Sequence, residues 1–583
     1  MLVTAAAPPS LSSYMKRLLS VVLLLWPAAV LAADPGAVSS ADRARHVLDR
    51  LGYGPRPGDV ARVEHMGIER YISQQLHPES IDDSDVERKL RAFETLRMDS
   101  PELMRDFYAE IRRFVANQER AGPPPSMAER LRSLPSRISL RAVGELQTAK
   151  ILRAAESERQ LYEVLVDFWS NHFNVDVKKG PVRVLKVVDE REVIRPHVLG
   201  RFRDLLGASA RSPAMLHYLD NTQSSKAYRV SEAEREIRDR VYGGLTGLKQ
   251  GLPGPRPDGM EGGLNENYAR ELLELHTLGV DGGYSQRDVV EVARCFTGWA
   301  HRPLTGEFVF MSARHDDGEK TVLGHVVPAG GGRGDGERVL DIVARHPSTA
   351  RFIAAKLCRR FVSDDPPEAL VERAAGVFRK TDGDLRAVVE TIVTSREMQS
   401  AAAYRAKVKP PFDLAVSALR ALGGTLVPDA DGTEAMKIRH ALEGAATLGY
   451  AREALAQARR QSLNWHIAEM AQPLYAFEAP TGYPEDSRRW ISASALLARM
   501  NFALSLTAGT VSDVRLPPPA LPGNVDLDDP EAVVRHLVRT LLPGEPAATR
   551  ETLLREARRE EGATANLAQL TALVLGSPEF QRR

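Results

Sequence analysis

The chain has 583 residues, and its 78 lysines and arginines balance 77 aspartates and glutamates, which excludes a global electrostatic case for nucleic acid as the partner. Two cysteines exclude a disulfide scaffold and a four-cysteine zinc site. Hydrophobic residues make up 43% of the chain, which is ordinary for a folded protein and supplies a large core.

The N-terminal segment has the pattern of a signal peptide. Lys16-Arg17 precedes a short apolar run, and Val30-Leu31-Ala32 fits the small-residue rule for cleavage, so we expect residues 1–32 to be removed. Because Met15 stands directly before the basic pair, residues 1–14 are consistent with a mis-assigned start. The mature protein is then periplasmic or secreted. The alternative is an uncleaved anchor; no later stretch is apolar enough to cross a membrane.

Helical periodicity dominates the rest of the chain, which predicts a mostly α fold: a large multi-helix domain with a small β-hairpin flap. We expect the main helical domain over residues 40–505, a linker over 506–529 and a C-terminal helical segment over 530–583. The predicted helices are Ser40–Leu51, Val60–Leu76, Ser84–Arg97, Pro101–Glu119, Ser126–Ser133, Ser139–Ala155, Glu158–His172, Glu190–Ala210, Tyr268–Leu278, Gln286–Trp299, Arg338–Ala344, Ser348–Val362, Pro367–Lys380, Leu385–Thr394, Pro411–Ala421, Ser492–Ser505, Pro530–Leu541 and Leu567–Leu575.

The flap is predicted from strand-like alternation. Glu307–Met311 and Lys320–Val327 alternate on either side of Asp316-Asp317-Gly318, and Asp-Gly between two such runs is a strong hairpin signal. We therefore expect these two runs to pair, with the polar turn exposed at the tip.

The two cysteines lie on apolar faces of predicted helices. Cys295 and Cys358 could form a disulfide in an oxidising compartment, or remain as buried free thiols that pack as small hydrophobic groups. We expect two free thiols.

Several sequence blocks resemble a bacterial exported family catalogued as "domain of unknown function 1800". The blocks, in chain order over roughly His46 to Phe502, are Phe168–Phe173, Ile194–Leu206, Pro213–Asn221, Asn265–Gly279, Tyr284–Val289, Thr297–Trp299 and His315–Lys320. Gly482-Tyr483-Pro484 stands where the family pattern has Gly-Trp-Pro, and Arg211-Ser212 where a histidine is expected. The resemblance implies the fold and export but no settled activity. Proteins that resemble this family often look like neighbours of a second exported family of unknown function (number 1501). The resemblance therefore suggests a second exported protein as a binding partner.

The most specific block carries a polar stripe. On a helical wheel, Asn267, Arg270, Glu271 and Glu274 share one side, and His276 falls on the apolar side. Such a stripe can be a solvated face with ion pairs, a buried polar network, or the lining of a site whose two carboxylates have separated pKa values. The sequence leaves all three open.

Two hypotheses for function follow. The first is an accessory or partner-binding protein that acts with another exported protein, which we favour because no complete nucleophile–base or metal-ligand set can be identified. The second is a periplasmic enzyme with a carboxylate/histidine pocket, metal-assisted or not, for a small or saccharide-like substrate; no cofactor is indicated. The candidate catalytic residues are Glu271, Glu274, His276 and His315, and the candidate binding residues are Asn265, Asn267, Arg270, Trp299, Asp316, Lys320 and His172. In the enzyme hypothesis, the flap tip covers the stripe.

Overall fold

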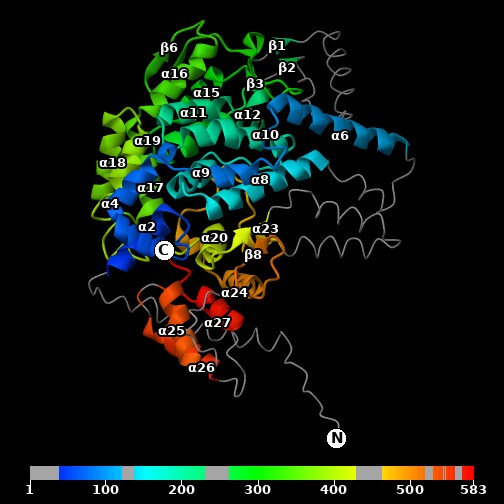
Figure 1. Cartoon of the computed structure of the whole chain (residues 1–583). Coiled ribbons are helices and arrows are strands. Elements are labelled where there is room, and N and C mark those ends of the chain that lie inside the picture. Colours follow the sequence, from blue (N-terminus) through cyan, green and yellow to red (C-terminus); the bar gives the residue numbers. More distant parts are fainter. Residues whose placement is uncertain are drawn as a thin grey trace.

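The computed structural model describes residues 39–120, 137–226, 228–229, 260–261, 263–427, 462–518, 529–542, 544, 546–558 and 567–583 (Figure 1). The predicted signal peptide and the predicted helix Ser126–Ser133 lie outside these residues. In the described chain no helix is both long and apolar enough to cross a membrane.

The protein is mostly α-helical, as predicted. Its α-helices are α2 (Ser40–Leu51), α3 (Asp59–Met66), α4 (Ile68–Leu76), α5 (Ser84–Leu90), α6 (Ser100–Arg120), α8 (Arg137–Glu156), α9 (Gln160–His172), α10 (Val182–Val188), α11 (Phe202–Arg211), α12 (Pro213–Tyr218), α14 (Asn267–Glu271), α15 (Gln286–Cys295), α16 (Arg333–Ala344), α17 (Pro347–Phe361), α18 (Glu368–Lys380), α19 (Leu385–Val393), α20 (Pro411–Ala421), α23 (Leu463–Glu469), α24 (Ala493–Thr507), α25 (Pro530–Leu541), α26 (Ala547–Ala557) and α27 (Leu567–Gly576).

Shorter elements join these helices. Two segments are π-helical, η2 (Asp189–Ile194) and η5 (Leu272–Thr277). The 3-10 turns are η1 (Pro78–Ser80), η3 (Arg195–His197), η4 (Asn221–Gln223), η6 (Ser312–Arg314) and η7 (Ser487–Trp490). The described strands form two-stranded antiparallel sheets: β1 (Tyr228–Arg229) with β2 (Met260–Glu261), β3 (Trp299–His301) with β4 (Phe308–Phe310), β5 (Lys320–Val322) with β6 (His325–Val327), and β7 (Thr425–Leu426) with β8 (Val514–Arg515).

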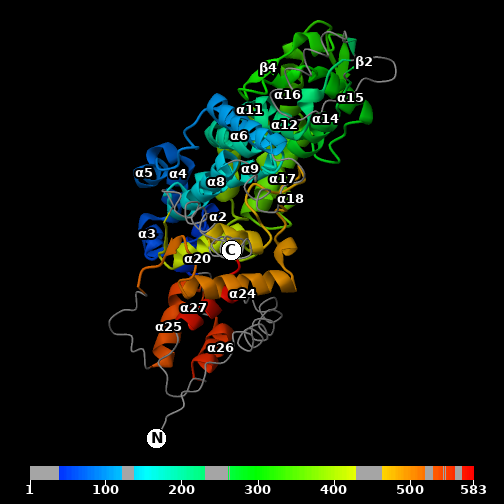
Figure 2. The ribbon, with the colours of Figure 1, turned by 90° about the vertical axis from the view of Figure 1, so that its right-hand side faces the viewer.

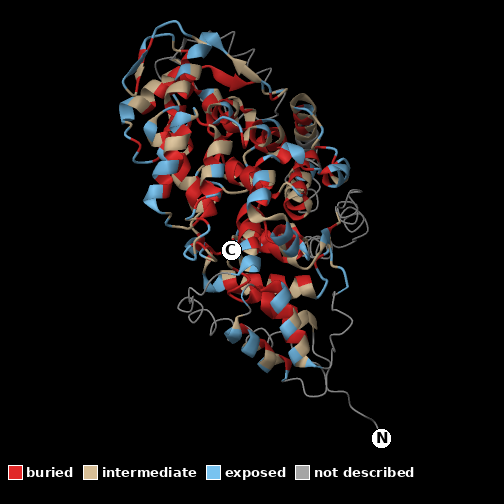
Figure 3. Cartoon of the chain, turned by 60° about the vertical axis from the view of Figure 1, so that its left-hand side comes forward, coloured by how far each residue is buried: buried red, intermediate tan, exposed pale blue. Residues whose placement is uncertain are grey.

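The molecule is elongated, and its helices lie in three tiers (Figure 2). One end carries α11, α12, α14–α16 and the sheets β3–β6. The middle holds α2 to α5, α8, α9, α17 and α20, and the other end holds α24 to α27. Buried residues run through all three tiers (Figure 3), and most of the buried hydrophobic ones belong to one continuous core.

Several predicted helices are shorter or broken in the structure. Ser84–Arg97 ends at Leu90, and Tyr268–Leu278 becomes π-helical after Glu271. Val60–Leu76 is two helices, because Gly67 between them adopts a φ of 91°. Glu190–Ala210 is interrupted at Pro196, which lacks a backbone N–H, and at Arg201, which forms a β-bridge with Asp384. Gln286–Trp299 ends at Cys295, because Gly298 turns the chain into β3 with a φ of 79°.

The predicted pairing of the hairpin flap is wrong, although the region does contain small hairpins. Phe308–Phe310 pairs with Trp299–His301, and Lys320–Val322 pairs with its immediate successor His325–Val327. Leu323-Gly324, with φ of 48° and 79°, makes the tight turn of the second hairpin. Gly318 does not adopt a positive φ, so Asp-Gly does not make a hairpin turn here.

The C-terminal segment packs onto the main body. The chain end forms a β-bridge between Val408 and Arg582, with backbone hydrogen bonds joining residues 407–409 to 581–583. Helix α27 packs against α24, and its apolar residues belong to the continuous core. The linker predicted over 506–529 is described only in part, so the proposed domain division stays a prediction. Cys295 and Cys358 are buried free thiols, as expected.

Candidate functional site

The polar stripe of the most specific block is a half-exposed face. Arg270 forms an i,i+4 ion pair with Glu266 at 3.2 Å and donates to Gln286 at 3.0 Å. Glu274 accepts a hydrogen bond from the Tyr284 hydroxyl at 3.2 Å. These contacts fit the surface-pairing interpretation of the stripe.

Two asparagine side chains at the start of the stripe hold it to the end of α12 by hydrogen bonds to the backbone of residues 219–220. Asn265 donates to the carbonyl of Asp220, and Asn267 donates to that of Leu219.

The carboxyl of Glu271 has a shifted pKa. Burial, then the neighbouring Glu274, raise the pKa of Glu271 above its usual value, while Arg270 lowers it. Among the described residues, no hydrogen bond to the Glu271 side chain is recorded.

His276 and His172 lie in the core, away from the exposed stripe. His172 Nε2 donates to the carbonyl of His276 at 3.1 Å, so its Nδ1 accepts from Lys356 Nζ at 3.0 Å. Burial, then Lys356, lower the pKa of His276 to about 3, and no described residue makes a hydrogen bond to its Nε2. Both imidazoles are therefore neutral at neutral pH.

The segment predicted to be an exposed tip is anchored at both ends. His315 and Lys320 are fully buried, and both approach Asp335 of α16, at 3.1 Å and 2.6 Å. Asp316 pairs with Arg294 at 2.9 Å, which holds the pKa of Asp316 below its usual value. These contacts attach the segment to α15 and α16. None of the recorded hydrogen bonds or ion pairs within the described chain joins it to the stripe.

Trp299 is a packing anchor. It opens β3, is fully buried, and lies against Gly336 of α16, where an added Cβ would be 2.6 Å from the ring. Its indole nitrogen has no hydrogen-bond partner among the described residues. The predicted site residues therefore divide among a surface face, a core histidine pair and a buried ion-pair cluster, and do not converge in one pocket. Among the described residues, no group of three or more metal-ligating side chains is found.

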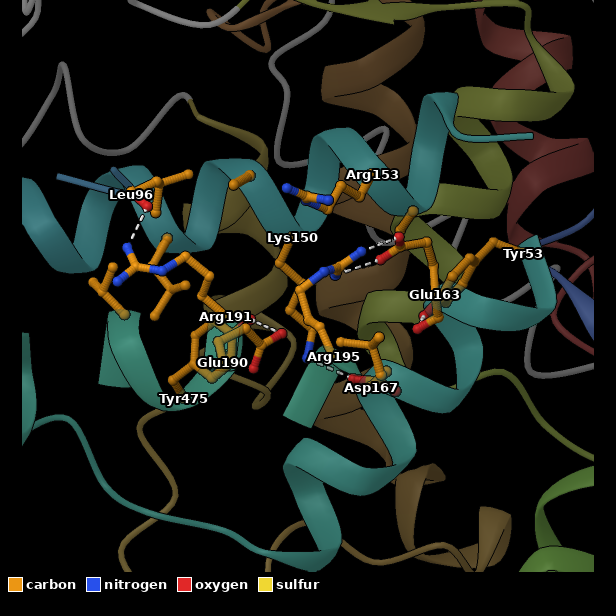
Figure 4. A pocket seen from close by; sticks show the side chains of 15 residues that line it. Tyr53, Leu96, Lys150, Arg153, Glu163, Asp167, Glu190, Arg191, Arg195 and Tyr475 are labelled. Atoms are coloured by element: carbon orange, nitrogen blue, oxygen red, sulfur yellow. Dashed lines mark hydrogen bonds and ion pairs between the residues drawn. The ribbon is translucent and has the colours of Figure 1, made fainter. Parts of the chain in front are cut away.

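Besides a groove of about 460 Å³ that α2, α3 and α25 line, two smaller cavities that the sequence did not predict lie in the middle tier. The larger, here called the Arg195 cavity, measures about 80 Å³ and is lined by α8, α9, η2 and the loop at Tyr475 (Figure 4). The smaller, the Arg360 cavity, measures about 40 Å³ and is lined by α9, α17, α20 and the loops 472–475 and 483–490. Lys150, Asp167 and Tyr475 line both cavities and form the wall between them.

In the Arg195 cavity, acids and bases are already paired. Arg195 makes two hydrogen bonds to Glu163, at 2.5 and 3.0 Å, and Lys150 pairs with Asp167 at 2.6 Å (Figure 4). Burial alone would raise the pKa of Glu163 and of Asp167, but Arg195 and Lys150 outweigh it and hold both below their usual values. Carboxylates held as ion pairs are poor proton acceptors, so this cavity is built for binding or stability.

Glu190 closes the same cavity with a second polar network. Ser170 and Tyr475 both donate to its carboxylate, at 2.9 and 3.2 Å, and Lys186 lies 3.6 Å away. Glu190 comes from the π-helix η2, and π-helical turns are frequent at functional sites.

The chain matches the family described as "Protein of unknown function (DUF1800)" over residues 46–582. It belongs to this family. The match reaches beyond the blocks seen in the sequence and takes in the C-terminal helices. Neither the curated proteins nor the solved structures give a match.

The blocks that point to the DUF1800 family contribute directly to these cavities. Ser170 and Asn171 of the first block line the Arg360 cavity, and Arg195 of the second block lines the Arg195 cavity. Tyr483 and Pro484, which stand where the family pattern has Trp-Pro, also line the Arg360 cavity. Sequence reasoning singled these blocks out but missed Arg360, Asp413 and Glu485. The burial of Arg360 could have been predicted from the sequence. It lies seven residues after Ile353, and residues at this spacing share one face of a helix, here the apolar one.

Proposed function

We propose that this DUF1800 protein is an exported accessory protein that binds another exported protein. The distribution of exposed apolar side chains carries the proposal. Of the six large hydrophobic residues exposed in the described chain, all but Leu140 fall between residues 264 and 326: Leu264, Val280, Leu304, Met311 and Val326. These residues belong to the tier that carries α14–α16 and the hairpins (Figure 2).

The failure of the candidate catalytic residues to meet supports the same proposal. Glu271 and Glu274 lie on the surface face, whereas His276 and His315 are fully buried in two separate clusters. Leu264 and Val280 flank the stripe in sequence, and a surface that combines polar and apolar groups is typical of protein-binding sites.

A photo-crosslinking amino acid in place of Val280 tests whether a partner protein binds at this end of the molecule. Val280 is 68% exposed, and Leu140 on α8, at 50%, is the matched control position. We expect adducts with one exported protein from position 280 and none from position 140, and loss of these adducts when Leu264 is changed to Ser. Equal adducts from both positions, or none, would count against a partner surface at this end.

Export has its own test. Mass analysis of the protein from its native compartment should give an N-terminus near Ala33 or Asp34, and a mature chain that still carries Lys16 would refute cleavage.

An enzyme remains the second candidate, because one lining carboxylate of the Arg360 cavity is not held in an ion pair within the described chain. Glu485 is the lining carboxylate without a recorded ion pair or side-chain hydrogen bond in the described chain. A screen of the mature protein against small saccharides, with Glu485→Gln as the matched variant, tests this candidate. Turnover that the variant lacks would favour the enzyme, and turnover that it keeps would place the chemistry elsewhere.

A further inference from the structure

The Arg360 cavity contains hydrogen-bond donors that the described chain does not satisfy. Arg360 is 3% exposed, and its Nε and Nη2 atoms have no hydrogen-bond partner in the part of the chain that the structure describes. Its closest carboxylates, Asp167 and Asp413, lie 3.6 and 3.7 Å away, too far for a hydrogen bond. Buried guanidinium donors without acceptors are costly, so an acceptor from outside the chain would stabilise them.

The nearby carboxylates are engaged with other cations. Asp167 pairs with Lys150 at 2.6 Å, and Asp413 pairs closely with Arg583. Each carboxylate therefore serves two basic groups. Burial opposes the charge on Arg360, but Asp413, Glu485 and Asp167 raise its pKa above the usual value, so it is a cation.

Two further guanidinium groups lie near the cavity residue Asp413: Arg583 pairs with it, and Arg50 neighbours Arg583. Arg50 and Arg583 are 1% and 2% exposed, and two nitrogens of each find no partner among the described residues. Burial is the main cause that lowers the pKa of Arg50 to about 9, and the neighbouring Arg583 lowers it further. The lining thus carries two cations, Arg360 and Lys150, and three carboxylates. Asp167 and Asp413 are paired with Lys150 and Arg583, and half-buried Glu485 forms no ion pair in the described chain.

We propose that the Arg360 cavity binds a small oxyanion, a carboxylate or phosphate group, through the free N–H groups of Arg360. The planar guanidinium matches the two oxygens of such a group. A volume of about 40 Å³ admits the oxyanion head of a ligand and little more. The site lies in a different tier from the proposed partner surface, so its failure leaves the proposed function standing, and the reverse also holds.

Thermal unfolding of the full mature chain tests the site, with inorganic phosphate and acetate compared with chloride at equal ionic strength. Binding to the folded state raises the melting temperature with ligand concentration. We expect such a rise with phosphate or acetate in the wild type and its loss in Arg360→Gln. Arg396→Gln, at a side chain that is 89% exposed, should keep the wild-type rise. No rise in the wild type, meaning that the cavity holds water only, or an equal rise in Arg360→Gln, would overturn the proposal.

Glu485→Gln gives an independent readout. Removing a negative charge from the lining should tighten binding of the same anion by about threefold to tenfold. In the described chain the Glu485 side chain makes no hydrogen bond or ion pair, and its charge acts on Arg360 and Arg583 without direct contact. This variant should therefore fold even if Arg360→Gln does not. Unchanged or weaker binding in Glu485→Gln would overturn the proposal.

Discussion

His276 marks the limit of what a helical wheel can give for a single residue. Its position on the apolar side of its helix predicts burial, and it is 1% exposed. The wheel cannot show that Lys356 of α17 approaches it, because that contact depends on how two distant helices pack. The same holds for His315, whose burial depends on Asp335 of α16.

Glu271 gives a pH-dependent prediction. Its folded pKa is raised above the usual value, mainly by burial, so ionised Glu271 lowers stability at neutral pH. We expect Glu271→Gln to raise the free energy of unfolding at pH 7 by about 0.5 kcal/mol at most, since the group is half-exposed and screened. The gain should fade as the pH falls through the folded pKa and then the unfolded one. Urea unfolding at pH 7 and pH 3.5 measures it; a loss of stability at pH 7, or a gain that persists at pH 3.5, would contradict it.

Removing the charge of buried Asp335 should lower the free energy of unfolding far more than removing the charge of exposed Asp317. Asp335→Asn leaves the buried Lys320 ammonium without a counter-ion, which costs about 3–5 kcal/mol. The matched control is Asp317→Asn, because Asp317 is 56% exposed and lies 3.9 Å from Lys226, so its loss should stay within about 0.5 kcal/mol. Denaturant midpoints compare the two variants, and similar midpoints would refute the role given to the Lys320–Asp335 pair.

At the scale of elements, helices with strong local signals were predicted correctly. The bounds of α2, α20 and α25 match the predicted ranges, because Ser39 and Asp529 cap two of them and Pro411 and Pro530 occupy first positions. Breaks inside long periodic runs were missed, because the apolar period continues through Gly67. Strand pairing was predicted wrongly, since three-residue strands carry too little alternation to fix partners.

Two helical glycines, Gly336 of α16 and Gly376 of α18, should respond in opposite ways to substitution by alanine. An added Cβ at Gly336 would lie 2.6 Å from the buried Trp299 ring, so Gly336→Ala should cost about 1–3 kcal/mol through overpacking. At Gly376, inside α18, nothing lies within 4 Å of an added Cβ, and Gly376→Ala should stabilise the protein by about 0.5–1 kcal/mol. Thermal unfolding separates the signs; loss of stability at position 376, or none at 336, would contradict the packing described.

At the scale of the whole molecule, the cavities could not be predicted because their walls come from distant segments. Arg360, Asp413 and Glu485 belong to α17, α20 and the loop 483–490, and each alone resembles an ordinary charged residue of a polar surface. Only tertiary packing brings them together with Lys150. The composition predicted a large core correctly, but the sequence could not show that this core is continuous into α27.

The last prediction concerns that continuity. A chain ending at residue 529 loses α27 from α24, the backbone pairing of residues 407–409, and Arg583 as the partner of Asp413. The buried Asp413 carboxylate would then have Arg360 at 3.7 Å as its remaining ion-pair contact in the described chain. An unpaired buried charge and an uncovered apolar face both destabilise the middle tier. We therefore expect lower amide-exchange protection throughout α20 in the shortened chain, together with a lower melting temperature. Unchanged protection in α20 would instead show that residues 530–583 form a separable segment, as the linker predicted from the sequence implies.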